Sequence, residues 1–474
     1  MPRRNIIWIA ILLAMTAVLL LVWRQPGGAR LGGPGEFGPV EQTYRVIREN
    51  FYQPIDAKDL QRAAVRGMVG ELDEFSTYVP PEKARSLTDR VLGEGRDLGL
   101  EWTLEKTGLV VLGPRPNSPA HKAGLFSGDR IVAIDGLAVG TLKPANIRSL
   151  LSPPPGKHVE LTVLDAQSNE TRVVRLKTEP YSVETVQGLF RDARGGWQYR
   201  MDEKNGVCYL RIPEFCPETP RRLVNLLREM ETPRGLVLDL RDNPGGVLSD
   251  GVAVADVFLR EGIIVRIVER DGKPQVYRAH SDTPHAEMPM VVLIDERTTS
   301  AAELVAGALA ANSRAVLLGQ RTRGKGRVQT MIRLPDKLGQ INLTTAEFLV
   351  PPDQAIQRHD GAKQWGVQPQ VTVALRDEQS EAIRRRRRST CLLPRPVKSA
   401  ATDEPDKNPT LLAVSKARAN DPQLARAEAL LQKPKQMQAI LRELAERNRL
   451  AREAFLKKQA EEARRAERQD EETQ

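Results

Sequence analysis

The stretch from residue 206 to residue 373 alternates short apolar runs with segments of helical pattern, and it constrains the fold more than any other part of the chain. Apolar runs of strand length, separated by helical segments, indicate βαβ units and hence a parallel sheet. The sequence therefore predicts an α/β core, assigned to residues 181–375. The predicted strands are Val207–Ile212, Leu236–Leu240, Val291–Ile294 and Ala315–Leu318, and the predicted helices are Leu223–Met230 and Ala301–Ala311.

Two segments of this core carry a serine and a lysine that can form a catalytic dyad. Ser300 stands where a strand gives way to a helix, and Lys325 lies in Gly324-Lys-Gly-Arg-Val-Gln329. A serine hydroxyl needs a partner that accepts its proton, and a lysine does this only when it is neutral. Burial among apolar groups lowers the pKa of a lysine from about 10.4 toward neutrality. Gln329 can orient the amine without adding charge.

A glycine turn precedes the serine in the chain. The segment Gly235-Leu-Val-Leu-Asp-Leu-Arg-Asp-Asn-Pro-Gly-Gly246 reads as a buried strand that ends in this turn, the shape that an oxyanion hole requires. The N–H group of Ala301 is a second donor, because the first N–H groups of a helix are unpaired and carry partial positive charge. Gly246 and Ala301 are therefore the candidate oxyanion donors.

Both motifs have other interpretations. Ser300-Ala-Ala-Glu303 also matches a capping box, so Ser300 can simply begin a helix. Gly319–Lys325 fits the start of the phosphate-binding motif G-x-x-x-x-G-K-[ST]. However, Gly326 stands where that motif places the hydroxyl that binds Mg²⁺.

The N-terminal region is expected to anchor the chain. Ile6–Trp23 is an apolar run of about the length of a short membrane span, and Arg3 and Arg4 before it favour a cytoplasmic N-terminus. The run ends in bulky residues rather than in a small-x-small cleavage site, which favours an uncleaved signal anchor. We expect the anchor at residues 1–24, a linker at 25–39 and a small helical segment at 40–88.

Residues 89–180 change to short strands and turns. Leu98–Trp102 and Gly108–Leu112 are predicted strands, and Pro119–Gly136 predicts a helix, a glycine turn and another strand. This stretch resembles a PDZ domain, whose groove binds a peptide C-terminus by adding it as a strand. The resemblance places Leu98, Gly99 and Leu100 where such domains present N–H groups to the terminal carboxylate. The alternative is a β-rich domain without a ligand.

Residues 376–474 are predicted to form a basic linker and a charged helical tail. The linker contains the run Arg384–Arg388, and a helix opens at Asp421–Leu424. The last stretch, from Lys435 to about Ala466, is a charged helix with a thin apolar stripe. That stripe can pair with another chain, can pair with the protein itself, or can belong to a solvated helix.

Composition excludes some classes of function. The net charge of +10 is concentrated in the Arg384–Arg388 run and the tail, which is weaker evidence for a nucleic-acid partner than a basic folded face, and we expect none. Three cysteines and five scattered histidines give neither a disulfide framework nor a metal-ligand spacing, so no metal and no cofactor are expected. Cys208 and Cys216 are either a single bridge or two core residues.

Three blocks in this order resemble the carboxyl-terminal processing peptidases, or tail-specific proteases. The blocks are Asp239–Gly246, Ser300-Ala-Ala-Glu303 and Gly324–Gln329. The resemblance covers residues 40–375, including Gly70–Tyr78, together with Asp421–Leu424. It implies Ser300 as nucleophile, Lys325 as base, Gln329 as its orienting partner, and Gly246 with Ala301 as the oxyanion hole. The chain departs from the family at Asp97, where a second glycine is common, and at Arg297, before the nucleophile.

We therefore expect an α+β multidomain protein with a membrane helix, a small helical segment, a PDZ domain, a peptidase core and a helical tail. Its expected function is that of a membrane-anchored serine endopeptidase on the periplasmic side of the inner membrane, acting on proteins with accessible apolar C-terminal tails. The alternative is an inactive membrane-anchored PDZ adaptor. The C-terminal helix is a candidate for adaptor binding or self-association.

Overall fold

The computed structural model describes residues 37–105, 108–154, 156–192, 194–201, 206–230, 233–280, 285–396, 417 and 419–473. The predicted anchor at residues 1–24 and most of the predicted linker lie outside these residues. No helix within the described ranges combines the length and apolar character needed to cross a membrane. The chain divides into two compact units, Met1–Met68 and Val69–Gln474.

The first unit contains helix α2 (Gly38–Asn50) and most of helix α3 (Ala57–Gly70). Both helices lie within the predicted helical segment at residues 40–88, except that α2 begins two residues before it. Phe51 follows the last residue of α2 and caps it, since its N–H group donates to the Ile47 carbonyl.

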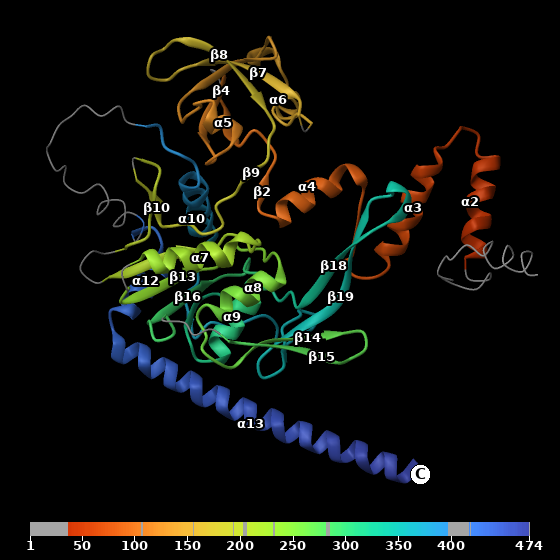
Figure 1. Cartoon of the computed structure of the whole chain (residues 1–474), viewed down its shortest axis with the longest axis vertical. Coiled ribbons are helices and arrows are strands. Elements are labelled where there is room, and N and C mark those ends of the chain that lie inside the picture. The colour runs from red at the N-terminus through yellow and green to blue at the C-terminus, as the bar shows by residue number, and fades with distance from the viewer. Residues whose placement is uncertain are drawn as a thin grey trace, which may run out of the picture. The chain divides into compact units, whose positions relative to one another are not determined.

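In the second unit, helix α4 (Pro81–Val91) precedes the PDZ-like region. A short antiparallel pair, β2 (Glu94–Gly95) with β9 (Tyr181–Ser182), joins the two ends of that region. The region itself, coloured orange to yellow in Figure 1, is a six-stranded sheet in the order β3-β4-β5-β7-β8, with β6 paired to β5. Its elements are β3 (Leu100–Glu105), β4 (Gly108–Pro114), α5 (Pro119–Lys122), β5 (Arg130–Ile134), β6 (Leu137–Ala138), η1 (Val139–Thr141), α6 (Pro144–Leu150), β7 (His158–Leu164) and β8 (Thr171–Lys177).

Strand β3 begins at Leu100 rather than at Leu98, where it was predicted. Gly99 has a φ of 63°, which lies outside the extended region and so delays the start of the strand. Leu98 instead enters the core of the PDZ-like region with Leu109, Ile131 and Leu161.

The predicted α/β core is built on a five-stranded parallel sheet in the order β12-β13-β16-β17-β21. This confirms the four predicted strands and adds a fifth at Val371–Thr372. The elements are β10 (Phe190–Arg191), β11 (Trp197–Gln198), β12 (Val207–Arg211), α7 (Glu218–Glu229), β13 (Gly235–Asp239), α8 (Leu248–Asp256), β16 (Met290–Ile294), α9 (Ala301–Ala311), β17 (Val316–Gly319) and β21 (Val371–Thr372).

Both faces of this sheet are buried, as is usual for parallel sheets. Alternate strand residues such as Leu238 and Val292 join one apolar cluster with side chains of α7, α8 and α9. Their neighbours, such as Val237 and Val291, join a second cluster with side chains of α12 and α13. Every residue of β13 and β16 is buried, so the sheet is a firm base for the loops at its ends.

A second sheet, which is antiparallel, packs beside the core in the order β1-β19-β14-β15, with β18 and β20 also paired to β19. The long strand β19 is paired with β1, β14, β18 and β20, so it ties the sheet together. The elements are β1 (Thr77–Val79), β14 (Ile263–Glu269), β15 (Pro274–Arg278), β18 (Arg327–Arg333), η2 (Pro335–Lys337), β19 (Gln340–Val350) and β20 (Gln354–Ala355).

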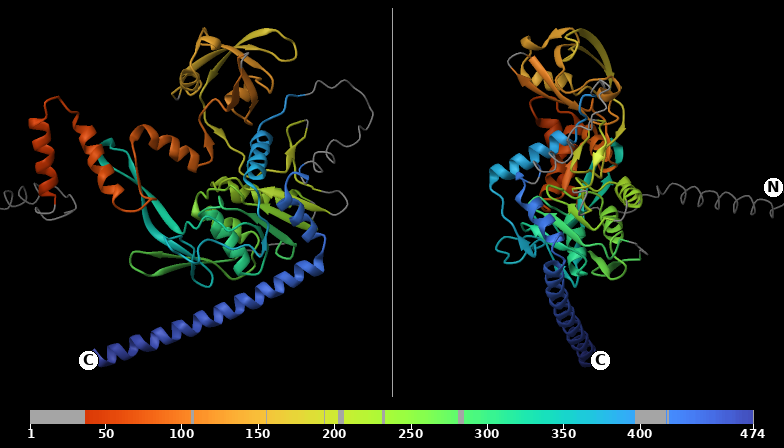
Figure 2. Two further views of the ribbon diagram at one scale, coloured as in Figure 1. Left: turned by 180° about the vertical axis from the view of Figure 1, so that it is seen from behind. Right: turned by 90° about the vertical axis from the view of Figure 1, so that its left-hand side faces the viewer.

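The C-terminal part is largely helical, with α10 (Asp377–Thr390), α12 (Pro422–Leu431) and α13 (Pro434–Thr473). Figure 2 shows α13 as one continuous helix. Its first turns pack on the core through Met437 and Leu444, so part of the predicted apolar stripe contacts the protein itself. The prediction of a basic linker from residue 376 onward is wrong for its first part, because Asp377–Thr390 forms helix α10.

The arginine run of α10 does not form a uniformly solvated surface. Arg387 is buried, and its Nη2 donates to Oδ2 of Asp239 at 2.5 Å. Arg241 and Tyr209 donate to the same carboxylate, and Arg241 also donates to both oxygens of Asp421 at 2.9 Å. Burial alone would raise the pKa of Asp239, but Arg241 and Arg387 hold it below its usual value. The run therefore contributes to an internal ion-pair network.

The chain after α10 returns to the PDZ-like region. The Leu393 N–H group donates to the carbonyl of Pro114 at the end of β4, at 2.9 Å. Arg395 then pairs with the buried Asp129 and, at 3.3 Å, with Asp165. This segment is therefore a third connection between the core and the PDZ-like region, beside β2 and β9.

Candidate active site

Three loops meet at one edge of the parallel sheet. Strand β13 runs into the glycine turn (residues 240–246), β16 into the serine loop (residues 295–300) and β17 into the lysine loop (residues 320–326). These strands are direct neighbours and parallel, so their carboxyl ends lie together, where ligands bind in open α/β sheets. The three separately predicted motifs are thereby brought into one place.

Hydrogen bonds hold the three loops to one another. The Thr299 N–H group donates to the Asn243 carbonyl, and Thr298 Oγ1 donates to the Leu240 carbonyl, both at 2.9 Å. The Arg323 N–H group donates to the Thr298 carbonyl at 3.0 Å. The serine loop is therefore fastened to the turn on one side and to the lysine loop on the other.

Ser300 occupies a strained position directly before helix α9. Its φ is 57° and its ψ is −121°, a combination that costs free energy in a residue with a side chain and that is concentrated at functional sites. Sharp strand-to-helix turns of this kind present a nucleophilic serine at the edge of a sheet. The glycine turn packs closely against it, since a Cβ atom on Gly245 would lie 2.8 Å from Ser300 Cβ. Ser300 is partly exposed and can reach a substrate.

Both predicted oxyanion donors lie beside this serine. The position of Gly246 is fixed by its neighbour Phe215, whose N–H group donates to the Gly245 carbonyl and whose carbonyl accepts from the Val247 N–H group. Among the hydrogen bonds of the described residues, the N–H groups of Gly246 and Ala301 have no protein acceptor. Both remain available for a ligand oxygen.

Glu303 connects the nucleophile to the lysine loop. Its Oε2 accepts the N–H groups of Ser300 and Lys325, both at 2.8 Å. Its Oε1 accepts the Gly324 N–H group and the Thr322 hydroxyl, both at 2.6 Å. Burial raises the pKa of Glu303, while these four donors act in the opposite direction. Loop N–H groups that a nucleotide phosphate would need are thus bound to a carboxylate, against the phosphate-loop interpretation.

Glu303 is not one of the predicted site residues. It was considered only as the last residue of the serine motif. A charged residue in the first turn of an otherwise apolar helix was the available signal, because a buried carboxylate needs donors around it. The Ser300 N–H bond to its side chain is one half of the predicted capping box. Helix initiation and site assembly therefore use the same residue.

Lys325 is partly buried and lies over an aromatic ring. Its Nζ is 5.1 Å from the centre of the Phe75 ring. Burial lowers the pKa of Lys325, while the carboxylates of Glu303, Asp73 and Glu74 act in the opposite direction. The environment thus moves the lysine in the direction that a general base requires.

Gln329 does not make the contact that the sequence predicted. Its Nε2 donates to Thr344 Oγ1 on the paired strand β19, at 3.2 Å. The reason is that Gln329 lies within β18, where Thr344 is its cross-strand partner. In this structure the Gln329 side chain is thus part of the sheet, and Phe75 is the group that contacts the Lys325 amine.

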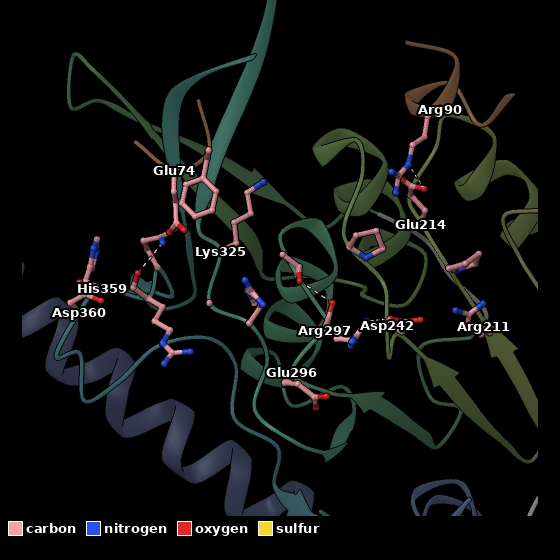
Figure 3. A pocket seen from close by; sticks show the side chains of 18 residues that line it. Glu74, Arg90, Arg211, Glu214, Asp242, Glu296, Arg297, Lys325, His359 and Asp360 are labelled. Carbon is pink, nitrogen blue, oxygen red and sulfur yellow. Dashed lines mark hydrogen bonds and ion pairs between the residues drawn. The ribbon is translucent and has the colours of Figure 1, made fainter. Parts of the chain in front are cut away.

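A cavity of about 1140 Å³ opens at this edge of the sheet. Lys325 and Thr299, the residue before the nucleophile, contribute to its lining (Figure 3). Arg297, which departs from the family pattern, pairs with Asp242 of the glycine turn at 3.6 Å. Several loops line the cavity, and it is rich in side chains of both charges: Glu74, Arg90, Arg211, Glu214, Asp242, Glu296, Arg297, Arg323, Lys325, Arg358 and Asp360.

The predicted carboxylate loop of the PDZ-like region is partly occupied by the chain itself. Asp97 Oδ1 accepts the Gly99 N–H group at 2.8 Å and the Tyr181 hydroxyl at 2.6 Å. Leu98 is buried, and its carbonyl accepts the Ala120 N–H group. Leu100 begins β3. Of the three expected donors, Gly99 is thus already paired to a carboxylate.

Comparison with known proteins matches two family models. The model described as Peptidase family S41 matches residues 206–373, and a PDZ domain model matches residues 110–165. The carboxyl-terminal-processing protease of Picosynechococcus sp. is 32% identical over 340 residues, covering 70% of this chain and 78% of the relative. The chain belongs to the carboxyl-terminal processing protease family. It is a serine peptidase of family S41 with a PDZ domain.

Other proteins similar to this protease are also named as C-terminal processing proteases. The carboxyl-terminal-processing protease of Synechocystis sp. is 32% identical, covering 70% of this chain and 75% of the relative. The carboxy-terminal processing protease CtpA of Bacillus subtilis is 27% identical over 79% of this chain and 78% of its own length. A solved structure of a photosystem II D1 C-terminal processing protease is 27% identical with a TM-score of 0.41, covering 72% of this chain and 87% of that chain.

Proposed function

We propose that this peptidase is a membrane-anchored endopeptidase that uses Ser300 as nucleophile and Lys325 as general base. The observation that carries the dyad is the shared bond to Glu303, whose Oε2 accepts the N–H groups of both residues at 2.8 Å. One buried carboxylate thereby holds the nucleophile and the base loop at a common point. The partial burial of Lys325 lowers its pKa and favours the neutral amine that a base must have.

The reaction would proceed through an acyl-enzyme. Neutral Lys325 takes the Ser300 hydroxyl proton as Oγ attacks the scissile carbonyl carbon, and the N–H groups of Gly246 and Ala301 stabilise the resulting oxyanion. The peptide C–N bond then breaks, and the leaving amine takes the proton from Lys325. A water molecule, deprotonated by Lys325, attacks the ester carbonyl, and Ser300 Oγ leaves with that proton.

We infer that the substrates are proteins with accessible, apolar C-terminal tails. A PDZ groove binds such a tail as an added strand, and β3 has a partner on one side only, β4, among the described strands. Leu98, Gly99 and Leu100 would lie at the carboxylate end of that groove. The Gly99 N–H group can serve only after it leaves Asp97.

We place the catalytic part on the outer side of the cytoplasmic membrane. The support is the sequence alone: the apolar run Ile6–Trp23 after Arg3 and Arg4. Protease accessibility of the full-length protein in spheroplasts tests this placement, and a catalytic part that is protected until the membrane is lysed would contradict it.

The dyad is tested with an unfolded model protein that ends in a free apolar C-terminus. Ser300→Ala and Lys325→Ala should both abolish cleavage while retaining wild-type binding of the tail. Thr330→Ala serves as a control, because the hydroxyl of this exposed residue of β18 bonds only Thr345 Oγ1 among the hydrogen bonds of the described residues. Tail binding without cleavage by the wild-type enzyme would favour the inactive PDZ adaptor. Full activity of Lys325→Ala would exclude the dyad.

A further inference from the structure

The residue that contacts the amine of Lys325 comes from far away in the sequence. We propose that Phe75 is a positioning residue for the base: its ring covers the Lys325 amine, keeps water from it and so maintains it in the neutral form. The observation is the 5.1 Å separation between Nζ and the ring centre. This inference rests on the proposed role of Lys325 as the base.

Phe75 is held in place by its own loop. Asp73 Oδ1 accepts the N–H group of Phe75 at 3.2 Å and that of Ser76 at 2.6 Å. Ser76 is buried, and its Oγ accepts the Thr344 N–H group of β19 at 3.1 Å. The position of the ring is therefore set by a turn that is bonded to the antiparallel sheet.

The same sheet carries the lysine. Strand β1 follows Ser76 directly and pairs with β19, and β18, which begins two residues after Lys325, also pairs with β19. Phe75 and Lys325 are thus both connected to β19, Phe75 through β1 and Lys325 through β18. Thr344 lies at the junction, since it receives the Gln329 side chain and donates its N–H group to Ser76. Gln329 therefore supports the Phe75 turn through Thr344.

The ring acts on the amine in two opposing ways. An ammonium group over an aromatic face is attracted to it, which favours the charged form and is worth less than about one pKa unit at this exposure. Removal of water disfavours the charged form by up to about 3–5 units at full burial. Burial is the leading influence on the pKa of Lys325, and the Phe75 ring, 5.1 Å from the amine, is one of the groups that cover it. The proposal is that the removal of water is the stronger of the ring's two effects.

Charged neighbours set the limits of this effect. Glu303 faces Lys325 from α9, and Asp73 and Glu74 face it from the Phe75 turn; all three favour the ammonium form. Arg323 and Arg358 line the same cavity. Without the ring, water and these carboxylates would together retain the proton on Lys325.

Two variants separate the exclusion of water from the Lys325 amine from the attraction of its ammonium form to the aromatic ring. Phe75→Ala removes both, while Phe75→Leu keeps an apolar cover and removes the aromatic face. We expect Phe75→Ala to raise the acidic limb of the pH profile of kcat/KM by about one unit. Its activity should fall about tenfold below that limb and recover at high pH. Phe75→Leu should stay near the wild-type profile. A loss caused by faulty folding would not recover with pH.

The pKa of Lys325 is also measured without activity, by competitive labelling with acetic anhydride in the Ser300→Ala background, read by peptide mass spectrometry. A rise in Phe75→Ala that matches the kinetic limb supports the proposal. If labelling shows a higher pKa for Lys325 in Phe75→Ala but the acidic limb of kcat/KM does not move, then Phe75 does shield the amine from water, but Lys325 is not the base. An unchanged or lowered pKa in Phe75→Ala overturns the proposal for Phe75. Loss of cleavage in Lys325→Ala would still support the dyad in that case.

Discussion

The main-chain N–H groups of Ser300 and Lys325 donate to the same oxygen, Oε2 of Glu303, at 2.8 Å each. The other oxygen of this carboxylate accepts two further donors of the lysine loop. A neutral side chain cannot replace it, because four donors converge on two oxygens. The geometry of the nucleophile and that of the base loop therefore depend on one buried charge.

Glu303→Gln should reduce kcat strongly with little change in KM. The amide NH₂ group would face two N–H donors, and each unsatisfied donor costs about 1–3 kcal/mol. We expect a loss in kcat of at least about a hundredfold, since misplacement of a catalytic group by about 1 Å has effects of this size. Steady-state kinetics with a fluorogenic peptide measures it. Glu378→Gln in the exposed first turn of α10 is the control. Unchanged kcat in Glu303→Gln would show that the shared bond is not required.

Gly246→Ala should inactivate the enzyme. The added Cβ would lie 2.0 Å from the Phe215 carbonyl oxygen, a backbone atom that cannot move aside cheaply, and the φ of 132° is unfavourable for alanine. The turn must shift, and its N–H group with it, for a loss of about 2.7–4 kcal/mol in transition-state stabilisation. Gly140→Ala, where a Cβ meets nothing within 4 Å, should be neutral. Full activity of a folded Gly246→Ala enzyme would place the oxyanion hole elsewhere.

Asp97→Gly should strengthen binding of a peptide with a free C-terminus. The Gly99 N–H group now donates to Asp97, and the substitution frees it and removes a negative charge. One hydrogen bond of about 1 ± 0.5 kcal/mol corresponds to roughly fivefold in Kd. Calorimetry with a peptide acid and its C-terminal amide measures the effect, and Asp97→Asn, which keeps the acceptor, separates charge from bonding. An equal gain for the amide would argue against a carboxylate site at Leu98–Leu100.

Asp421→Asn should destabilise the protein at neutral pH and less so in acid. Burial would raise the pKa of Asp421, but its pairing with Arg241 holds the pKa below the usual value. The stability from this carboxylate is therefore present above the unfolded pKa of about 3.9 and is lost as the pH falls toward the folded value.

Removing one partner of a buried pair costs about 3–5 kcal/mol. Urea unfolding at pH 7 and pH 3.5 measures the difference between wild type and variant, which should narrow at the lower pH. Glu446→Gln removes an exposed pair with Arg449 on α13 and should leave the free energy of unfolding nearly unchanged at either pH. A pH-independent difference for Asp421→Asn would contradict the assignment.

The parallel sheet and its three motifs could be predicted from local sequence. Strands β12, β13, β16 and β17 can be recognised in the sequence as apolar runs. Strand β13 is buried along its whole length, so both of its faces need apolar side chains and its apolar run is nearly continuous. Ser300, Gly246 and Ala301 could be named as candidates for a similar reason: each stands near the end of such a strand or at the start of a helix. Their convergence followed from the parallel order of the strands.

Contacts between distant segments could not be predicted in this way. Gln329 was expected at the Lys325 amine, but its register in β18 places it beside Thr344. From the sequence alone, the Arg384–Arg388 run is expected to be exposed to solvent. In the structure, however, Arg387 is buried against Asp239, 148 residues away along the chain. The sequence shows that burying an arginine costs free energy, but it does not show which carboxylate will offset that cost.

The sequence by itself determined the peptidase core, the PDZ-like region, and the serine and lysine that we propose as the dyad. These depend on periodicity and on short motifs, which are properties of neighbouring residues. The tertiary structure decided that Glu303 holds both loops, that Asp97 occupies its own carboxylate loop, and that Phe75 covers Lys325. Such contacts depend on strand register and loop packing, which form only when the whole chain has folded.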